Sequence, residues 1–371
     1  MKRLRLALVI PTMDRGGAEK QLALLARHLP TDQFETHVIL LTRDGPRSDD
    51  LRQAGIRVTL IGKRFKADPT ALLRLRKELK RLQPDLVHTW LFAANSFGRV
   101  AAKLAGVPLI LASERCVDPW KRGWHFVIDR YLAKSTHAIT TNSAGVRDFY
   151  AAHRVPAELF RLIPNGVAPR SPGKLSRQQA FEVFGFDSTR NVILAVGRLW
   201  AQKRYRDLIW AGELLAAARG DTSLLIIGDG PQKDELLRFR DSVTTPQHVA
   251  FLGPREDVVD LLPHADQFWI GSDYEGQSNA VIEAMRAGVP VVASDIPGNR
   301  DLVEHDVTGR LFPVGDRAEL AREAMELLEN PEHARTLADS ARGRIETDFS
   351  IEQMVEKHTR LYQELWREHV C

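Results

Sequence analysis

The sequence is poor in cysteine and contains no long hydrophobic run. Its two cysteines, Cys116 and Cys371, lie far apart, so they do not form the disulfide framework of a small secreted protein and they fit a reducing cytosol. The basic amino terminus is followed by an apolar stretch, Leu6 to Ile10, that is too short for a signal peptide. No run approaches the ~20 apolar residues that cross a membrane. These absences predict a cytoplasmic protein, with a peripheral position on the inner face of the cell membrane as an open alternative.

Several ligand motifs are also missing from the sequence. There is no G-x-G-x-x-G dinucleotide fingerprint and no cluster of His and Cys residues at metal-ligand spacing. No internal repeat of fixed period and no low-complexity segment is present. We therefore expect no cofactor and no bound metal ion.

What is present is enough apolar and charged residues for a folded protein with an uneven charge distribution. A hydrophobic content of 44% in 371 residues supports sizeable cores and roughly two domains. The net charge of +4 hides an asymmetry, because residues 1–168 hold 28 Lys and Arg against 15 Asp and Glu, a balance of +13. The remaining residues balance at −9. The first half could therefore face an anionic surface or an anionic substrate.

The positive charge is densest between Lys63 and Leu82, where four leucines at helical spacing form an apolar stripe (Leu72, Leu75, Leu79 and Leu82). This pattern predicts a helix that is docked on its domain by the leucines. Its basic side either contacts anionic lipid or is simply solvated, and both interpretations stay open. Nucleic-acid binding is disfavoured, because no aromatic interleaving and no nucleic-acid motif accompanies the charge.

Apolar runs of strand length alternate with helical stretches along the whole chain, which predicts parallel sheets with right-handed crossovers. The strands expected in the first half are 4–10, 36–41, 58–61, 86–88, 109–112 and 137–141, and those in the second half are 191–196, 224–228, 249–253, 267–270 and 289–293. The string RLIPNGV at 161–167 and the Pro/Gly/Ser-rich stretch at 169–174 break regular structure. We place the domain junction there and predict an N-terminal domain at 1–168, a C-terminal domain at 169–345 and a separate final helix within 346–371.

The stretch from Gly271 to Ala287, GSDYEGQSNAVIEAMRA, follows an apolar strand and becomes helical after Ser278 or Asn279. A helix N-terminus binds phosphate through its free N–H groups and its dipole. Glu275 and Glu283 stand eight residues apart beside it, so one could hold sugar hydroxyls and the other a ribose. The alternative is a capping loop and a solvent-facing glutamate.

Other strand ends carry further candidates. The cations Arg198 and Lys203 follow the strand at 191–196 and could hold a diphosphate, or could be two surface cations. Turn glycines follow the strands at 224–228 and 249–253, with Arg255 nearby. The paired glycines Gly16 and Gly17 follow the first strand and predict either a phosphate cradle or an ordinary turn.

The string EGQSNAVIEAM, followed by AGVPVVASDIPGNRDLVEHDVTGRLFPVGD, resembles the retaining glycosyltransferases of the glycogen-synthase-like group (glycosyl transferases group 1). The IPNGV string, the GRL…K element at Gly197 to Lys203, and the N-terminal GG loop with Glu19 are similar to elements of the same family. The resemblance covers most of the chain and is densest from Val192 to Asp316. It implies the GT-B fold, an α/β architecture of two doubly wound Rossmann-like domains that face each other across a cleft, with the last helix crossing back to the first domain.

The resemblance also implies a reaction and a set of site residues. A sugar moves from a nucleoside diphosphate sugar, expected to be a UDP sugar, to a glycan or lipid-linked acceptor with retention at the anomeric carbon. The C-terminal domain holds the donor, the N-terminal domain holds the acceptor, and no protein nucleophile is assigned. The residues with a catalytic role are Arg198, Lys203 and Glu275, and the donor-binding residues are Gly16, Gly17, Gly197, Gly228, Arg255, Gly276, Gln277, Ser278, Asn279, Ala280 and Glu283. Many other glycosyltransferases hold a metal with a D-x-D pair, but the nearest match here, Asp273-Tyr274-Glu275, uses a glutamate already assigned to the sugar, so we expect metal-independent transfer.

The sequence departs from the family at Ser113-Glu114-Arg115, where many relatives have a histidine near the donor sugar. Glu114 and Arg115 are candidates for that place.

Trp120 and Trp124, beside Lys121 and Arg122, suit contacts with a sugar face or a lipid phosphate, and the alternative is a surface loop tucked in by its tryptophans. His88, at another strand end, could line the cleft or be structural.

Two other classes of function stay open. One is a nucleotide-sugar epimerase or hydrolase of the same fold, which would act without an acceptor. The other is a non-catalytic protein that binds a sugar nucleotide. The expected partners in every case are a nucleotide sugar and, for the transferase, a glycan or lipid-linked acceptor, with an anionic membrane surface as a further possibility.

Overall fold

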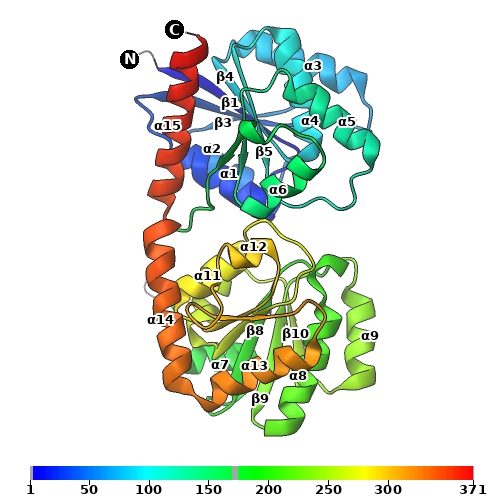
Figure 1. The fold of residues 1–371 in the computed structure, drawn as a ribbon, viewed down its shortest axis with the longest axis vertical. Helices are drawn as coiled ribbons and strands as arrows, with labels where there is room; N and C mark the ends of the chain where they lie inside the picture. The colour runs from blue at the N-terminus through cyan, green and yellow to red at the C-terminus, as the bar shows by residue number, and fades with distance from the viewer. Residues whose placement is uncertain (1–2, 169–173, 371) are drawn as a thin grey trace. The chain divides into compact units, whose positions relative to one another are not determined.

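The computed structural model describes residues 3–168 and 174–370. The chain forms two compact units, and each is described by itself. Unit 1 comprises Met1–Gly166 and Phe349–Cys371, and unit 2 comprises Val167–Asp348 (Figure 1). The sequence places the corresponding boundaries at residues 168 and 345. Cys371 and most of the Pro/Gly/Ser-rich junction expected at 169–174 lie outside the described residues.

Unit 1 is built on a seven-stranded sheet with the order β3-β2-β1-β4-β5-β6-β7, and every neighbouring pair is parallel. Its strands are β1 (Leu4–Ile10), β2 (Phe34–Leu40), β3 (Arg57–Leu60), β4 (Leu86–Trp90), β5 (Leu109–Glu114), β6 (Ala138–Thr141) and β7 (Phe160–Leu162). Its helices are α1 (Gly17–His28), α2 (Arg47–Gln53), α3 (Pro69–Leu82), α4 (Leu91–Ala105), α5 (Gly123–Ala133), α6 (Ala144–Ala152), η1 (Ala157–Leu159) and α15 (Ile351–His369).

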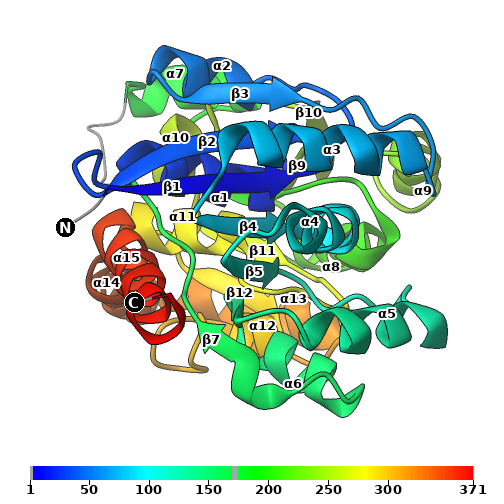
Figure 2. The same ribbon diagram turned by 90° about the horizontal axis from the view of Figure 1, so that it is seen from above.

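Alternate residues of β1 point to opposite faces of this sheet and so divide the core into two layers. Leu6 and Leu8 pack with residues of α1, α2 and α15 on one face. Ala7 and Val9 pack with residues of α3 and α4 on the other. Figure 2 shows the helices on both sides of the sheet, which explains why the strand reads as a continuous apolar run rather than as an alternating one.

Unit 2 has a six-stranded sheet with the order β10-β9-β8-β11-β12-β13, and all its pairs are parallel. Its strands are β8 (Asn191–Val196), β9 (Thr222–Ile227), β10 (Val249–Gly253), β11 (Gln267–Ile270), β12 (Val291–Ser294) and β13 (Arg310–Phe312). Its helical elements are α7 (Arg177–Phe184), η2 (Ala201–Lys203), α8 (Tyr205–Arg219), α9 (Lys233–Val243), α10 (Val258–Leu261), η3 (Leu262–His264), α11 (Asn279–Ala287), α12 (Pro297–Arg300), α13 (Arg317–Glu329) and α14 (Pro331–Asp348).

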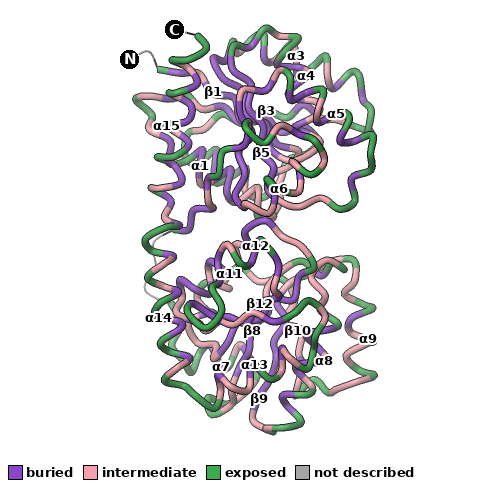
Figure 3. The backbone as a smooth tube through the Cα atoms, viewed as in Figure 1, coloured by how far each residue is buried: buried purple, intermediate pink, exposed green. Residues whose placement is uncertain are grey.

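Both sheets therefore have the doubly wound arrangement that the sequence predicts. In each sheet the first three strands run outward in one direction and the later strands in the other, so the order reverses between β1 and β4 in unit 1 and between β8 and β11 in unit 2. Open α/β sheets bind ligands beyond the carboxyl ends of the strands at such a reversal. The buried residues concentrate in the strands (Figure 3), which leaves the loops at these ends to carry function.

The last helix, α15, belongs to unit 1 and packs against α1. Its residues Ile351, Met354, Tyr362 and Leu365 join the core on that face of the sheet. Within 3–168 and 174–370, no helix combines the length and the apolar character needed to cross a bilayer.

Candidate functional site

The strand-order reversal of unit 2 brings together the two loops that the sequence singles out. One loop follows β8 and carries Gly197, Arg198 and Lys203, and the other follows β11 and carries Glu275. Lys203 Nζ lies 2.5 Å from Glu275 Oε1, and the two side chains are 17% and 12% exposed. Ser272 Oγ donates a second hydrogen bond of 2.8 Å to the same carboxylate oxygen. A cation and a carboxylate are thus held together at the position where this fold binds ligands.

Further bonds between the same two loops fix this ion pair in place. Gln202 Nε2 donates to the carbonyl of Tyr274 at 2.6 Å, and the amide of Asp273 donates to the carbonyl of Gln202 at 2.9 Å. Arg204 Nη1 binds Asp273 Oδ1 at 2.9 Å. Arg204 has a positive φ of 51°, an unusual conformation for a residue that is not glycine. The tie between the loops explains how that conformation is maintained.

Helix α11 begins at this site without a side-chain cap. Ser278 is its N-cap residue and makes no side-chain cap hydrogen bond, whereas the N-cap side chains of α3 and α13, Asp68 and Asp316, each accept a bond from their own helix. Gly276, Gln277 and Ser278 are buried just ahead of the helix. An N-terminus of this kind offers backbone N–H groups and a positive dipole end to an anion.

Close backbone contacts require glycine at two positions around the site. A Cβ on Gly228 would lie 1.9 Å from the carbonyl oxygen of Gly197, and the φ of Gly228 is +150°. A Cβ on Gly298 would lie 2.1 Å from the carbonyl oxygen of Gly276. The loops after β8 and β9 are therefore packed backbone to backbone, as are α12 and the loop after β11, and Gly228 has a structural reason to be glycine besides the predicted contact with a donor.

The remaining predicted residues of unit 2 occupy three different settings. Arg198 is exposed, and its guanidinium lies 4.7 Å from the ring centre of Trp200. Glu283 is half-buried in the middle of α11. Arg255 makes a two-pronged ion pair with Asp257, with hydrogen bonds of 2.8 and 2.7 Å. A contact between Arg255 and a nucleotide base would have to form beside that pair or at its expense.

In unit 1 the glycine loop after β1 is closely approached by a carboxylate. Gly16 is the N-cap residue of α1, and the position of a Cβ on Gly16 would be 2.0 Å from Glu19 Oε2. Thr12 Oγ1 lies 3.4 Å from the other oxygen of the same carboxyl group. The N-terminus of α1 therefore already faces a negative group supplied by its own first turn, while Gly17 is exposed.

Glu114 lies at the end of β5 in a buried network of charges. It accepts hydrogen bonds from Asn95 Nδ2 at 2.9 Å and from the Tyr150 hydroxyl at 3.0 Å. Lys121 Nζ lies 3.8 Å from it, and the same ammonium group binds Asp129 Oδ2 at 3.0 Å. Burial raises the pKa of Glu114 to about 7 although Lys121 opposes the shift. Glu114 thus ties strand β5 to α4 and α6 directly, and to α5 through Lys121 and Asp129.

Arg115 and His88 are also buried beside α15. The Arg115 guanidinium lies 4.9 Å from the ring centre of Trp90 and bonds to the side chain of Asn165, and burial lowers the pKa of Arg115 to about 9. His88 contacts the Tyr362 hydroxyl at 2.8 Å and Thr140 Oγ1 at 3.1 Å. His88 therefore has the structural role that the sequence left open as an alternative, because both of its ring nitrogens are occupied inside unit 1.

Trp120, in the loop between β5 and α5, and Trp124, in the first turn of α5, are both exposed. Trp120 is 51% exposed and Trp124 is 58% exposed. Trp120 Nε1 donates to Asp118 Oδ1 at 2.9 Å, and its ring meets Phe92 edge-on. The interpretation of a loop tucked in by its tryptophans does not agree with this exposure.

Comparison with known proteins gives matches in both halves of the chain. Residues 15–171 match the family described as Glycosyltransferase Family 4. Residues 176–344 match the family described as Glycosyl transferases group 1. Each half of the chain therefore matches a glycosyltransferase family model.

Named relatives and solved structures agree with these family matches. The chain is 26% identical over 359 residues to the UDP-Gal:alpha-D-GlcNAc-diphosphoundecaprenol alpha-1,3-galactosyltransferase of Escherichia coli, with 90% of each chain covered. It is 26% identical over 364 residues to the 2-deoxystreptamine N-acetyl-D-glucosaminyltransferase of Streptomyces fradiae, with 87% of this chain and 85% of the relative covered. The structure of Anabaena HepE in complex with UDP-glucose superposes with a TM-score of 0.86 at 23% identity, over 98% of this chain and 100% of that one. The sucrose-phosphate synthase of Thermosynechococcus elongatus gives a TM-score of 0.81 at 18% identity, over 99% of this chain and 100% of the other. The fold is thus confirmed as that of the GT-B proteins, with two Rossmann-like domains.

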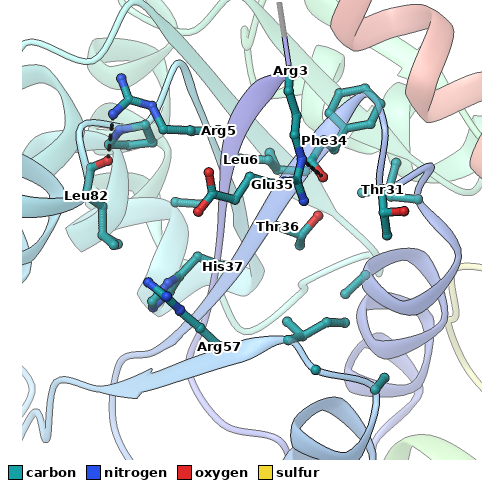
Figure 4. Close-up of a pocket in the computed structure, with 17 residues that line it drawn as sticks. Arg3, Arg5, Leu6, Thr31, Phe34, Glu35, Thr36, His37, Arg57 and Leu82 are labelled. Atoms are coloured by element: carbon teal, nitrogen blue, oxygen red, sulfur yellow. Dashed lines mark hydrogen bonds between the residues drawn. The ribbon is translucent and has the colours of Figure 1, made fainter.

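A separate cavity of about 250 Å³ lies at the amino ends of β1, β2 and β3 of unit 1. Figure 4 shows Arg57 beside His37, with Glu35 between them and Arg5. His37 contacts Thr59 Oγ1 at 2.8 Å, and burial lowers its pKa. Because ligands of this fold bind at the carboxyl ends of the strands, this cavity is at the wrong end of the sheet to belong to the predicted site.

Among the described residues, no group of three or more His, Cys, Asp or Glu side chains could hold a metal ion.

The prediction missed the residues that brace the ion pair. Ser272 bonds to Glu275, and Gln202 and Arg204 bond to the loop that carries it. Gln202 and Arg204 flank Lys203 in the sequence, and Ser272 comes three residues before Glu275. Their position next to the predicted residues is the only signal that the sequence offers for them.

Proposed function

We propose that the protein is a retaining glycosyltransferase that moves a hexose from a UDP sugar to a glycan or lipid-linked acceptor on the cytoplasmic side of the membrane. The observation that carries the proposal is the pair of Lys203 and Glu275, 2.5 Å apart, beside the uncapped start of α11. The E. coli and Streptomyces relatives are named as glycosyltransferases, and this supports the reaction class. Retention at the anomeric carbon is taken from the family resemblance.

In this proposal unit 2 binds the donor through charges of both signs. Lys203 and Arg198 bind the diphosphate and stabilise the negative charge that accumulates as it leaves. The N–H groups at the start of α11 bind the phosphate or the sugar, and Glu275 accepts hydrogen bonds from sugar hydroxyls. Glu283, on the same helix, binds the ribose. The position of these residues at the strand-order reversal of unit 2 supports the assignment.

Unit 1 is the proposed acceptor domain, with Trp120 as the residue that touches the acceptor. Its exposed ring at the end of β5 supports this role, because aromatic faces pack on sugar rings. Glu114 and Arg115 are weaker candidates than the sequence suggests, since both are buried and bonded within unit 1. In this proposal Glu114 and Arg115 do not touch the acceptor. They fix the position of the loop after β5, which carries Trp120.

We further propose that the reaction needs no metal ion, because Arg198, Lys203 and the α11 N-terminus together supply the positive potential that a metal would provide. The test measures initial rates of transfer from UDP-glucose and UDP-galactose with and without EDTA. Two acceptors suggest themselves from the relatives' names, GlcNAc-diphosphoundecaprenol and 2-deoxystreptamine. Thermal-shift screening selects the donor first, since a ligand at 100 times its dissociation constant stabilises by about 2.7 kcal/mol.

The expected result is full activity in EDTA and a loss of ~100-fold or more in turnover for Arg198→Ala, the scale seen when one electrostatic donor to a transition state is removed. Arg360→Ala is the matched control, because Arg360 is exposed on α15 and forms a surface pair with Glu356. Activity that vanishes in EDTA and returns with Mg²⁺ or Mn²⁺ would overturn the metal-free mechanism. Release of the sugar without transfer to any acceptor would favour the epimerase or hydrolase instead.

A further inference from the structure

Helix α5 exposes an apolar stripe on its outer side. Trp124, Val127 and Tyr131, at i, i+3 and i+7, are 58%, 55% and 63% exposed. On the opposite side of the same helix, His125 and Asp129 are buried, and Asp129 binds Arg99 and Lys121. Phe126, Leu132 and Ala133 are buried as well, and a helix on the surface of a soluble domain normally keeps its apolar residues on that inner side alone. The outward stripe is therefore not explained by the packing of unit 1.

Exposed apolar residues continue from α5 onto the two neighbouring helices. Leu104, on α4, is 52% exposed, and Leu73, on α3, is 61% exposed. Arg76 Nε, one turn after Leu73, donates to the carbonyl of Leu104 at 3.0 Å. Lys103 Nζ lies 5.9 Å from the ring centre of Tyr131, which joins α4 to α5. Figures 1 and 2 show α3, α4 and α5 side by side over one face of the sheet. We call this surface, formed by Leu73, Leu104, Trp124, Val127 and Tyr131, the α5 face.

The charged residues around the α5 face are almost all basic. The exposed cations on its three helices and on the residues that border them are Arg74, Lys77, Lys80, Arg81, Lys103, Arg122 and Lys134. The carboxylates of the same segments are turned inward, since Asp68, Glu114 and Asp129 are buried. Glu78 is largely covered and pairs with Arg81. The occupant of this surface must therefore present negative charge outside and an apolar layer beneath it.

We propose that the α5 face docks the protein on an anionic phospholipid bilayer. The rings of Trp124 and Tyr131 lie at the boundary between headgroups and acyl chains, where amphipathic aromatic side chains are favoured. The lysines and arginines of α3 and α4 pair with lipid phosphates, each attracted to the negative surface of the leaflet. The inference is independent of the proposed sugar transfer, because it rests on the surface of unit 1 and would hold for a protein without that activity.

The test is co-sedimentation of the full chain with vesicles of phosphatidylcholine containing 30% phosphatidylglycerol, compared with vesicles of phosphatidylcholine alone. The wild type is expected to bind the anionic vesicles, and binding is expected to fall as salt is raised, because interactions between exposed charges are screened. The double variant Trp124→Ser/Tyr131→Ser is expected to lower the partition coefficient by roughly tenfold or more, since two buried apolar groups are lost from the interface. The double variant Lys77→Glu/Lys80→Glu tests the charge separately. It is expected to lower the partition coefficient at low salt only.

Leu214→Ser is the matched control, because Leu214 is 44% exposed on α8 of unit 2 and is expected to leave binding unchanged. Thermal unfolding of every variant checks that the fold is kept. Brominated acyl chains provide a second readout, since they quench the fluorescence of a tryptophan at the acyl boundary, and Trp124→Phe should remove most of the quenched signal.

Three results would overturn the proposal. One is equal binding to neutral and anionic vesicles, and another is unchanged binding of the folded Trp124→Ser/Tyr131→Ser variant. The third is a wild type that self-associates through this surface, seen as a dimer in sedimentation velocity that the double variant abolishes while vesicle binding stays the same.

Discussion

Lys203→Met removes the cation from the ion pair with Glu275 and tests the site at its centre. In the structure Lys203 Nζ and Glu275 Oε1 are 2.5 Å apart, and neither side chain is more than 17% exposed. A hydrogen bond to a charged group contributes roughly 1.5–3 kcal/mol, and little solvent is present here to screen it. Since 1 kcal/mol shifts Tm by about 2–4 °C in a domain of 150–250 residues, we expect the transition of unit 2 to fall by about 3–12 °C.

Substitutions of Lys203 and Glu275 are expected to have opposite effects on the binding of UDP. Without a donor, Lys203 is engaged by Glu275, so a diphosphate must compete with that carboxylate for the ammonium group. Lys203→Met should therefore weaken binding of free UDP. Glu275→Gln should strengthen it by up to about tenfold, equal to about 1.4 kcal/mol, because the competing negative charge is gone. Both variants should lose ~100-fold or more in turnover.

Calorimetric titration with UDP and calorimetric unfolding measure these effects. The double variant Lys203→Met/Glu275→Gln completes a double-mutant cycle. Arg342→Met is the control, because Arg342 forms a surface pair with Asp339 in which the side chains are 37% and 54% exposed, and such pairs contribute only about 0.2–1 kcal/mol. The reasoning would be refuted if Glu275→Gln weakened UDP binding as much as Lys203→Met does, or if Lys203→Met kept wild-type turnover.

Two further predictions concern Glu283 and Glu114. Glu283→Ala is expected to weaken the binding of UDP and of the UDP sugar by the same amount, roughly 1.5–3 kcal/mol, because a ribose contact is common to both ligands. A calorimetric titration in which only the sugar nucleotide loses affinity would exclude the ribose role. For Glu114 the folded-state pKa of about 7 lies above the ordinary value of 4.5, so its contribution to stability is complete below pH 4.5 and is lost as the pH rises toward 7. Urea unfolding between pH 4.5 and pH 7 should thus show the wild type losing stability relative to Glu114→Gln by up to ~1.4 kcal/mol per pH unit, and parallel stability curves would contradict the assignment.

Much of the fold could be predicted from the sequence, because buried parallel strands are continuous apolar runs. The strands at 4–10, 191–196, 249–253 and 267–270 have the predicted bounds. Helix α4 begins at Leu91, four residues before Asn95. Asn95 does not start the helix, since its side chain is buried and bonds to Thr89 and Glu114. Helix α7 was missed although Ser176 and Gln179 form a capping box, a signal that is readable in the sequence.

The sequence supplies candidate residues for the site but not the distances between them. Lys203 and Glu275 were assigned through the resemblance, and no local pattern could show that they touch, because their contact depends on β8 and β11 being neighbours in the sheet. The same holds for Glu114, whose position at a strand end suggests a role toward substrate. Its burial becomes visible only when Lys121, Tyr150 and Asp129 are placed around it.

The position of α15 has a consequence for the order in which the protein folds during synthesis. Unit 2 is contiguous in the chain, so all of it has been synthesised before α15 is made. Unit 1 begins with the first strand, yet one face of its sheet, with Leu6 and Leu8, is covered by Ile351, Met354 and Tyr362 of the last helix. The half of the protein that is translated first is therefore the half that completes its core last. Until α15 emerges, an apolar sheet face stays open to other chains, and slow translation of the second half prolongs that exposure.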